Sequence, residues 1–174
     1  MDKPLLNAKN LSIRYLDSDK YVVKDFNFEL NKGEILCLRG RSGIGKTTVT
    51  AAVMGMLPIC NAEAKGNLYY NDIDLISAPE SELQKLRWRE IALVPQSSMN
   101  AFNPVFTIRK TLREMMLLEN NRISKAEMAC REEELMDMVH LDRSVLGCYA
   151  HEMSGGMKQR AAIALSVIYS PKLL

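Results

Sequence analysis

The stretch Gly40-Arg41-Ser42-Gly43-Ile44-Gly45-Lys46-Thr47 decides the fold of this chain. It matches the Walker A pattern, in which a glycine and four further residues precede Gly-Lys-Ser/Thr. Glycines in such a loop let the backbone curl until several N–H groups point at one place, and the helix that follows adds partial positive charge there. The pattern therefore predicts a phosphate-binding loop, lined by Gly40, Ser42, Gly43 and Gly45.

Three side chains at the end of this loop have predicted roles in holding a nucleotide. The Lys46 ammonium is expected to reach the β- and γ-phosphates, and the Thr47 hydroxyl is expected to ligate Mg²⁺. Thr48 adds a further hydroxyl for a phosphate hydrogen bond. The loop therefore predicts ATP and Mg²⁺ as cofactors.

The residues around the loop predict the strand–loop–helix context that such a site needs. Residues 35–38 are continuously apolar, which is typical of a strand buried on both faces. We therefore expect Glu34–Arg39 to be a buried strand and Cys37 to be a buried, reduced thiol. Thr47–Met56 is expected to be a helix that ends near Gly55. This context disfavours the alternative, a chance glycine-rich turn.

Alternation of apolar and polar residues near the N-terminus predicts an antiparallel β ribbon, formed by Leu11–Tyr15 and Tyr21–Leu30. A helix is expected from Pro79 to Arg87. Further strands are expected at Asn67–Tyr70, Ile91–Val94 and Lys172–Leu174.

The second half of the chain has mainly helical spacing, over Thr107–Leu118 and Ser124–Val139. Ser124 and Glu127 form a capping box at the start of the second of these helices. A third helix is expected to begin at Ser154, whose side chain is suited to cap it.

Composition and charge narrow the possible functions. The 174 residues suit one domain, and a hydrophobic content of 47% supports a sizeable core. The 23 basic and 21 acidic residues are interspersed, so the net charge of +2 gives no basic face for nucleic acid. The sequence shows neither a membrane-spanning stretch nor a signal-peptide pattern. Its four cysteines form no C-x-x-C pair, so we expect a cytosolic chain.

A second anion site is predicted from Met153-Ser154-Gly155-Gly156-Met157-Lys158-Gln159-Arg160. Ser154 and the N–H groups of Gly155 and Gly156 open a helix, where they can hold a γ-phosphate. The alternative is an ordinary serine N-cap followed by two glycines. The stretch resembles the signature of ATP-binding cassette (ABC) ATPases, usually L-S-G-G-Q followed by a basic residue, Gln and Arg. In that family the phosphate belongs to ATP on a partner, so the resemblance implies two cassettes closed around two nucleotides.

The resemblance implies roles for two further residues. Gln96 follows the expected strand Ile91–Val94, where the family places a glutamine that senses Mg²⁺ and the attacking water. Taken alone, a glutamine after Pro95 would be a surface residue. Tyr15 ends the first strand about where the family keeps an aromatic residue that stacks on adenine, and Tyr21 competes for that role.

The resemblance is closest to the ATPases of oligopeptide, dipeptide and nickel importers. Residues 98–108 look like their "M-x-x-L-N-P-V-x-T-I" stretch, and Tyr149–Glu152 resembles their "Y-P-H-E". Two positions depart from the usual pattern, because Met157 replaces Gln and Ala150 replaces Pro.

These motifs imply an α/β fold of the P-loop NTPase (RecA-like) class. The expected core carries an N-terminal antiparallel β ribbon and an inserted α-helical subdomain, and it is incomplete at the C-terminus. The implied division is a nucleotide-binding core with Walker A, a helical subdomain, and a signature helix with the start of the Walker B strand, over residues 1–97, 98–152 and 153–174.

The resemblance implies the ATP-binding, energy-coupling subunit of a bacterial importer for peptides or nickel-like solutes. Its partners would be transmembrane permease subunits and a second cassette, with no nucleic acid, at the cytoplasmic face of the membrane. In the family the Walker B acidic residues and a switch histidine follow a stretch like Ser170–Leu174, so we expect the chain to be inactive alone. Two alternatives stay open, a nucleotide-binding fragment without turnover and a soluble ABC ATPase that acts outside transport.

The loop after Gln96 is unusually apolar, and in the family the neighbouring groove receives a short helix from the permease. We expect one of Phe102 and Phe106 to be partly exposed and the other to anchor the loop to the core. The alternative is that both rings are plain core residues.

Overall fold

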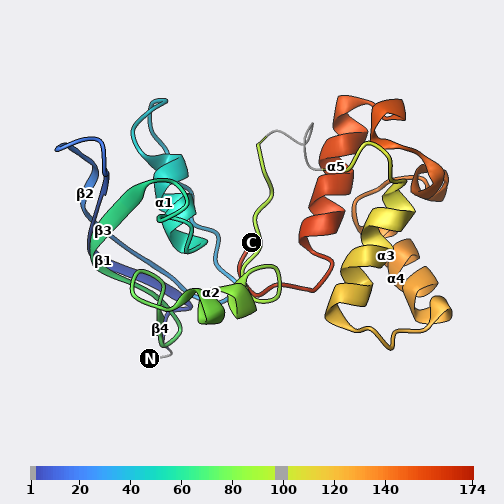
Figure 1. Ribbon diagram of the computed structural model, residues 1–174, viewed down its shortest axis with the longest axis horizontal. Helices are drawn as coiled ribbons and strands as arrows, with labels where there is room; N and C mark the ends of the chain where they lie inside the picture. Colours follow the sequence, from blue (N-terminus) through green and yellow to red (C-terminus); the bar gives the residue numbers. More distant parts are fainter. Residues whose placement is uncertain (1–2, 97–101) are drawn as a thin grey trace. The chain divides into compact units, whose positions relative to one another are not determined.

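The computed structural model describes residues 3–96 and 102–174 (Figure 1). The chain divides into two compact units, Met1–Lys85 and Leu86–Leu174. The first unit contains β1 (Leu6–Tyr15), β2 (Tyr21–Leu30), α1 (Lys46–Val53), β3 (Ala62–Tyr70), β4 (Ile73–Asp74) and all but the last residue of α2 (Glu80–Leu86). The second contains α3 (Ile108–Glu119), α4 (Lys125–Met138), the 3₁₀ turns η2 (Arg143–Gly147) and η3 (Ala150–Glu152), and α5 (Gly155–Ser166). The three-part division at residues 97 and 152 stays a prediction.

The first unit is built on an antiparallel sheet with the strand order β2-β1-β3-β4. The predicted ribbon is confirmed, because β1 pairs with β2 in a register that sets Leu6 opposite Leu30 and Ile13 opposite Val23. Leu11 and Ile13 of β1 are fully buried, and Ser12 between them is only 8% exposed, so both faces of the strand are covered at this point. The predicted strand near Tyr70 is also present as β3, and it extends back to Ala62.

The expectation of a buried strand before the phosphate loop is wrong for the described structure. Residues 34–40 form no strand, Ile35 is 98% exposed, and Cys37 is exposed rather than buried. A continuously apolar strand is buried when parallel strands flank it on both sides. Among residues 3–96 and 102–174 no strand pairs with this segment, so its apolar side chains lie in solvent.

The predicted strand Ile91–Val94 is reduced to isolated bridges. Ile91 pairs in parallel with Leu173, and the Ala92 N–H donates to the Leu173 carbonyl oxygen at 2.9 Å. This pairing also brings in the predicted last strand, Lys172–Leu174, at a single position. Parallel pairs need long crossover connections, and the helices between residues 91 and 173 form the connection here.

The second unit packs α3, α4 and α5 around one apolar core (Figure 1). Leu112 of α3 and Leu135 and Met136 of α4 are almost completely buried. The predicted capping box of α4 is confirmed, because the Ser124 hydroxyl accepts from the Glu127 N–H while the Glu127 carboxylate accepts from the Ser124 N–H. None of the described helices has the length and apolar character that crossing a membrane requires.

Candidate functional site

The phosphate loop ends at a helix whose first turn is open to an anion. Gly45 is the N-cap of α1, and it offers no side chain to cap the helix. The first intrahelical bond runs from the Val49 N–H to the Gly45 carbonyl oxygen at 2.9 Å, so the N–H groups of residues 46–48 point out of the helix end. Unpaired N–H groups and the helix dipole together attract phosphate.

The Lys46 side chain folds over the loop that precedes it. Its ammonium group donates to the carbonyl oxygens of Gly40 at 2.8 Å and Arg41 at 2.7 Å. The ammonium charge is therefore held beside the curled backbone, where a phosphate bound to the helix end would meet it.

The backbone conformation explains why the loop needs glycine at two positions. Gly43 and Gly45 have φ angles of +81° and +100°, a region that residues with a Cβ rarely adopt. A Cβ on Gly45 would also lie 2.8 Å from the Val23 side chain of β2. The close approach of α1 to the sheet therefore depends on Gly45.

The two threonines of α1 differ in their surroundings. Thr47 is exposed, as a residue that ligates Mg²⁺ from the loop should be. Thr48 is only 6% exposed, and its hydroxyl lies 3.1 Å from the hydroxyl of Tyr15. Ser42 is exposed on the loop.

The structure brings Tyr15 rather than Tyr21 into contact with the phosphate-loop helix. Tyr15 is the last residue of β1 and lies opposite Ala62 of β3. Tyr21 begins β2 and lies opposite Arg14. An aromatic ring beside α1 is well placed for a base whose phosphates sit at the helix end, so the geometry favours Tyr15 for the stacking role, which stays a prediction.

A cavity of about 440 Å³ lies beside the phosphate loop in the first unit. Its lining combines apolar side chains with three cationic ones, and it includes Val22, Val23, Phe26, Leu38, Ile44 and Val49 together with Lys24, Arg39 and Lys46. The cavity therefore offers both apolar contact surface and positive charge. It adjoins the exposed segment 34–40 described above.

The predicted second anion site lies at the start of α5 in the second unit. Ser154 is the N-cap, and its hydroxyl oxygen accepts from the Met157 N–H at 3.3 Å. Gly155 and Gly156 are exposed, and a Cβ on either would meet nothing within 4 Å. The ordinary capping role is therefore present, and binding of a γ-phosphate stays a prediction.

The segment before Gln96 is tied to this same helix. The Gln159 amide donates to the Pro95 carbonyl oxygen at 3.4 Å. The Ser166 hydroxyl lies 3.0 Å from the Leu93 carbonyl oxygen and shares its one hydrogen between that oxygen and the Ala162 carbonyl oxygen at 2.8 Å. Gln96 itself is exposed at the end of this segment. The sequence singled out Gln96 but not Ser166, because a serine inside a helix carries no local signal of a distant partner.

The expectation for the two phenylalanines is confirmed. Phe102 is 8% exposed and belongs to the core of the second unit, whereas Phe106 is half-buried. The Lys110 ammonium lies 3.5 Å above the centre of the Phe106 ring, and the neighbouring Val105 is 70% exposed. Residues 98–101 of the same stretch lie outside the described residues.

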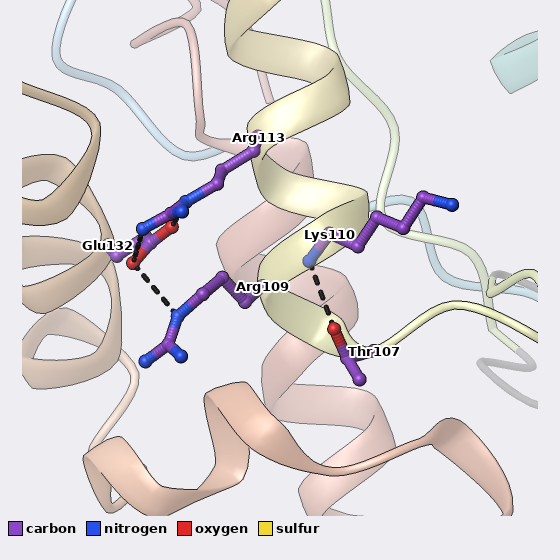
Figure 2. Close-up of polar contacts among 5 residues, drawn as sticks. All are labelled: Thr107, Arg109, Lys110, Arg113 and Glu132. Atoms are coloured by element: carbon purple, nitrogen blue, oxygen red, sulfur yellow. Dashed lines mark hydrogen bonds and ion pairs between the residues drawn. The ribbon is translucent and has the colours of Figure 1, made fainter. Parts of the chain in front are cut away.

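A buried carboxylate that no sequence motif marks lies between α3 and α4 in the second unit. Figure 2 shows Glu132 of α4 between two arginines of α3, with its side chain 3% exposed. Arg109 Nε donates to it at 3.3 Å, and Arg113 donates through both Nε and Nη2. At the start of α3 the Thr107 hydroxyl accepts from the Lys110 N–H at 3.2 Å. The charge run around Glu132 predicts a solvated helix face, so no sequence signal marked this glutamate as buried.

The remaining titratable side chains of the described residues do not meet the requirements of a metal site. Within residues 3–96 and 102–174, no three His, Cys, Asp or Glu side chains are grouped so that they could hold a metal ion. His151 stacks on the ring of Tyr149, with the ring centres 5.5 Å apart. Burial raises the pKa of Tyr169 above its usual value, and the nearby Glu119 charge adds to the effect.

The family model described as ABC transporter matches residues 23–174. The chain belongs to the ABC transporter family. Membership implies nucleotide binding, and the resemblance found in the phosphate loop and the signature stretch is confirmed. The roles assigned to individual residues stay predictions.

Several curated relatives are transport proteins. Over 174 residues the chain is 37% identical to the oligopeptide transport ATP-binding protein OppD of Escherichia coli (strain K12), covering 98% of this chain and 51% of that protein. It is 35% identical to the dipeptide transport ATP-binding protein DppD of Lactococcus lactis subsp. cremoris, covering 99% and 51%. It is also 35% identical to the metal-staphylopine import system ATP-binding protein CntD of Staphylococcus aureus (strain NCTC 8325 / PS 47), covering 98% and 63%. The chain spans about half the length of the first two relatives.

Solved structures show the same fold. A dimeric post-hydrolysis state of the ATP-binding cassette MJ0796, bound to ADP and Pi, matches with a TM-score of 0.80 at 25% identity, covering 95% of this chain and 70% of that one. CbiO1 from Clostridium perfringens matches with a TM-score of 0.80 at 20% identity, covering 98% and 63%, and shows the fold alone. The predicted fold class, a P-loop NTPase core with an antiparallel ribbon and a helical subdomain, is confirmed.

Proposed function

We propose that this chain is the ATP-binding, energy-coupling part of an ABC importer for peptides or nickel-like solutes. The observation that carries the proposal is the open first turn of α1, with the Lys46 ammonium held over the loop before it. In this proposal the N–H groups of residues 46–48 and Lys46 bind the phosphates, and Tyr15 stacks on the adenine. The solute class rests on the names of the relatives, which are oligopeptide, dipeptide and metal-staphylopine transport proteins.

Mg²⁺ belongs to the same proposal. A hard divalent cation bound to nucleotide phosphates takes oxygen ligands, and the exposed Thr47 hydroxyl lies at the phosphate end of α1. The amide oxygen of Gln96 is the other Mg²⁺ ligand that the family resemblance implies. When bound, the ion would neutralise charge on the β- and γ-phosphates.

The partner proposed for the nucleotide is a second cassette. The exposed Gly155 and Gly156 begin α5 and leave N–H groups beside the Ser154 hydroxyl, which suits a γ-phosphate brought by another chain. A dimeric cassette is among the structures that this chain resembles. We propose that ATP is held between two such cassettes, and that turnover needs the Walker B acidic residues of the family.

The permease partner is proposed to dock at the half-buried Phe106. This ring and the exposed Val105 give an apolar contact for a short helix, and they follow the segment that carries Gln96. Docking there would hold the chain at the cytoplasmic face of the membrane.

Nucleotide binding is tested with residues 1–174 and two variants, Lys46→Ala and the matched control Lys65→Ala. Lys65 is an exposed lysine of β3 and is not part of the phosphate loop. Removing Lys46 deletes charge-assisted bonds worth about 1.5–3 kcal/mol, so titration with MgATP should show a loss of about tenfold or more in affinity. The control should bind like the parent, and both variants should melt near the parent temperature. Equal MgATP binding by the parent and Lys46→Ala would remove the basis of the proposal.

A further inference from the structure

The contact between Tyr15 and Thr48 joins the two ends of the proposed nucleotide site. Tyr15 ends β1, and Thr48 is the third residue of α1, with the two hydroxyl oxygens 3.1 Å apart. Thr48 is 6% exposed and Tyr15 is half-buried, so water competes little for this hydrogen bond. The hydrogen bond therefore restricts the orientation of both hydroxyl groups.

The chemistry of the two hydroxyls gives the contact a direction. Each has one hydrogen to donate and can accept from others. When the Tyr15 O–H donates to Thr48 Oγ1, the Thr48 hydrogen is left to donate elsewhere. Thr48 belongs to the helix turn whose N–H groups point out toward a phosphate, so its hydroxyl can donate toward the same anion.

We propose that the Tyr15 hydroxyl is a positioning group for the phosphate site, acting through Thr48. It holds the first turn of α1 against the end of β1 and orients the Thr48 hydroxyl toward a bound phosphate. This inference rests on the proposed function, and it assigns Tyr15 a task that its ring does not perform. Adenine stacking needs the ring, whereas this task needs the hydroxyl.

The sheet explains why Tyr15 can hold its place. β1 pairs with both β2 and β3, and its last residue, Tyr15, lies opposite Ala62, the first residue of β3. Arg14, the preceding residue, forms an ion pair with Glu63 of β3 at 2.6 Å. Helix α1 in turn contacts β2 and β3. Because this end of β1 is paired, the Tyr15 hydroxyl is held in place and can in turn hold the first turn of α1.

The test separates the hydroxyl from the ring. Residues 1–174 are compared with Tyr15→Phe, Thr48→Val and the double variant, using MgATP and magnesium tripolyphosphate, which has no base, as probes. Each single variant should weaken binding of both probes about threefold to tenfold, the worth of one hydrogen bond. The double variant should be no weaker than the weaker single variant, because both changes remove the same bond.

Two matched variants exclude simpler explanations. Tyr21→Phe removes a hydroxyl from another half-buried tyrosine of the same sheet and should bind both probes like the parent. Thr48→Ser keeps the hydroxyl and should bind both probes more tightly than Thr48→Val. All titrations are run well below the melting temperature of every variant. If the two hydroxyls served folding alone, the variants would melt at lower temperatures but bind the probes with unchanged affinity at the titration temperature.

The outcomes are distinct. Parent-like MgATP affinity in Tyr15→Phe overturns this inference and leaves the proposed function standing. Additive losses in the double variant also overturn it, because they assign the two hydroxyls separate tasks. A parent chain that binds no MgATP at all contradicts the proposed function itself.

Discussion

The hydroxyl oxygen of Ser154 accepts a hydrogen bond from the backbone N–H of Met157 at 3.3 Å, which caps α5 at its first turn. The same hydroxyl is proposed to contact a γ-phosphate on a second cassette. Substitutions at Ser154 therefore have two effects that must be measured separately, one on the stability of the helix and one on association.

We predict that Ser154→Arg blocks MgATP-driven association of two chains and leaves MgATP binding by the single chain nearly unchanged. The long cation would stand where the partner's nucleotide should lie. Loss of the cap costs about 1 kcal/mol of stability. Ser154→Ala is the comparison variant, since it loses the same cap and the proposed γ-phosphate contact without adding bulk, and it should weaken association less than Ser154→Arg does. Sedimentation velocity with and without MgATP measures association, and equal loss of association and nucleotide binding would instead indicate a role in folding.

A second prediction concerns the buried carboxylate of the helical unit. Glu132→Gln should lower the free energy of unfolding by about 1–3 kcal/mol, because it removes the charge that pairs with Arg109 and Arg113. The cost is smaller than for a fully buried pair, since the two arginine side chains are 46% and 35% exposed. Urea unfolding followed by the fluorescence of Trp88, the single tryptophan, reports on this unit.

Glu133→Gln is the matched control for this prediction. Glu133 is the next residue of α4 and also pairs with an arginine, Arg143 at 2.6 Å, but both side chains are more than half exposed. Its loss should change the free energy of unfolding by less than about 0.5 kcal/mol. Equal effects of the two substitutions would contradict the role given to burial at Glu132.

The sequence predicted correctly those elements that depend on residues close together in the chain. The ribbon of β1 and β2 follows from alternation, and the start of α4 follows from the capping box at Ser124 and Glu127. The apolar loop also predicted that one of Phe102 and Phe106 is anchored in the core, without predicting which ring it is. For the ribbon and the capping box, the decisive contacts lie within a few residues of one another or between neighbouring strands.

Features that depend on distant partners could not be predicted in the same way. An apolar run such as residues 35–38 indicates that these side chains favour burial. Whether they are buried depends on flanking strands, which the run itself does not predict. Glu132 lies in a charge run, and its burial depends on two arginines 19 and 23 positions away in α3. Thr48 was expected to hydrogen-bond to phosphate. Its contact with Tyr15 could not be predicted, because it depends on how α1 packs on the sheet.

A third prediction compares two glycines with positive φ. Gly66 of β3 has a φ of +90°, and a Cβ there would lie 2.3 Å from the backbone oxygen of Asn10. Gly33 has a φ of +78°, and a Cβ there would meet nothing within 4 Å. Gly66→Ala should therefore destabilise the first unit by at least about 2 kcal/mol more than Gly33→Ala. Circular dichroism melts of the two variants measure the difference, and similar melting temperatures would show that β1 and β3 can separate without cost.

The last prediction is a pH dependence that comes from the capping box of α4. The hydroxyl and the backbone N–H of Ser124 lower the pKa of Glu127 below its usual value of 4.5. A lowered pKa in the folded state means that the ionised carboxylate stabilises the fold above the pKa of the unfolded chain. That stabilisation is lost as the pH falls from the usual glutamate range through the lower, folded pKa.

Glu127→Gln should therefore be less stable than the parent near pH 6, and the gap should close on acidification toward about pH 3. The glutamine keeps the length of the side chain but has no charge to lose. Glu114→Gln, at an exposed position of α3, serves as the control and should show no comparable gap. Urea unfolding curves at several pH values give the free energies. A gap that stays constant from pH 6 to pH 3 would mean that the capping box acts through a hydrogen bond that does not depend on the carboxylate charge.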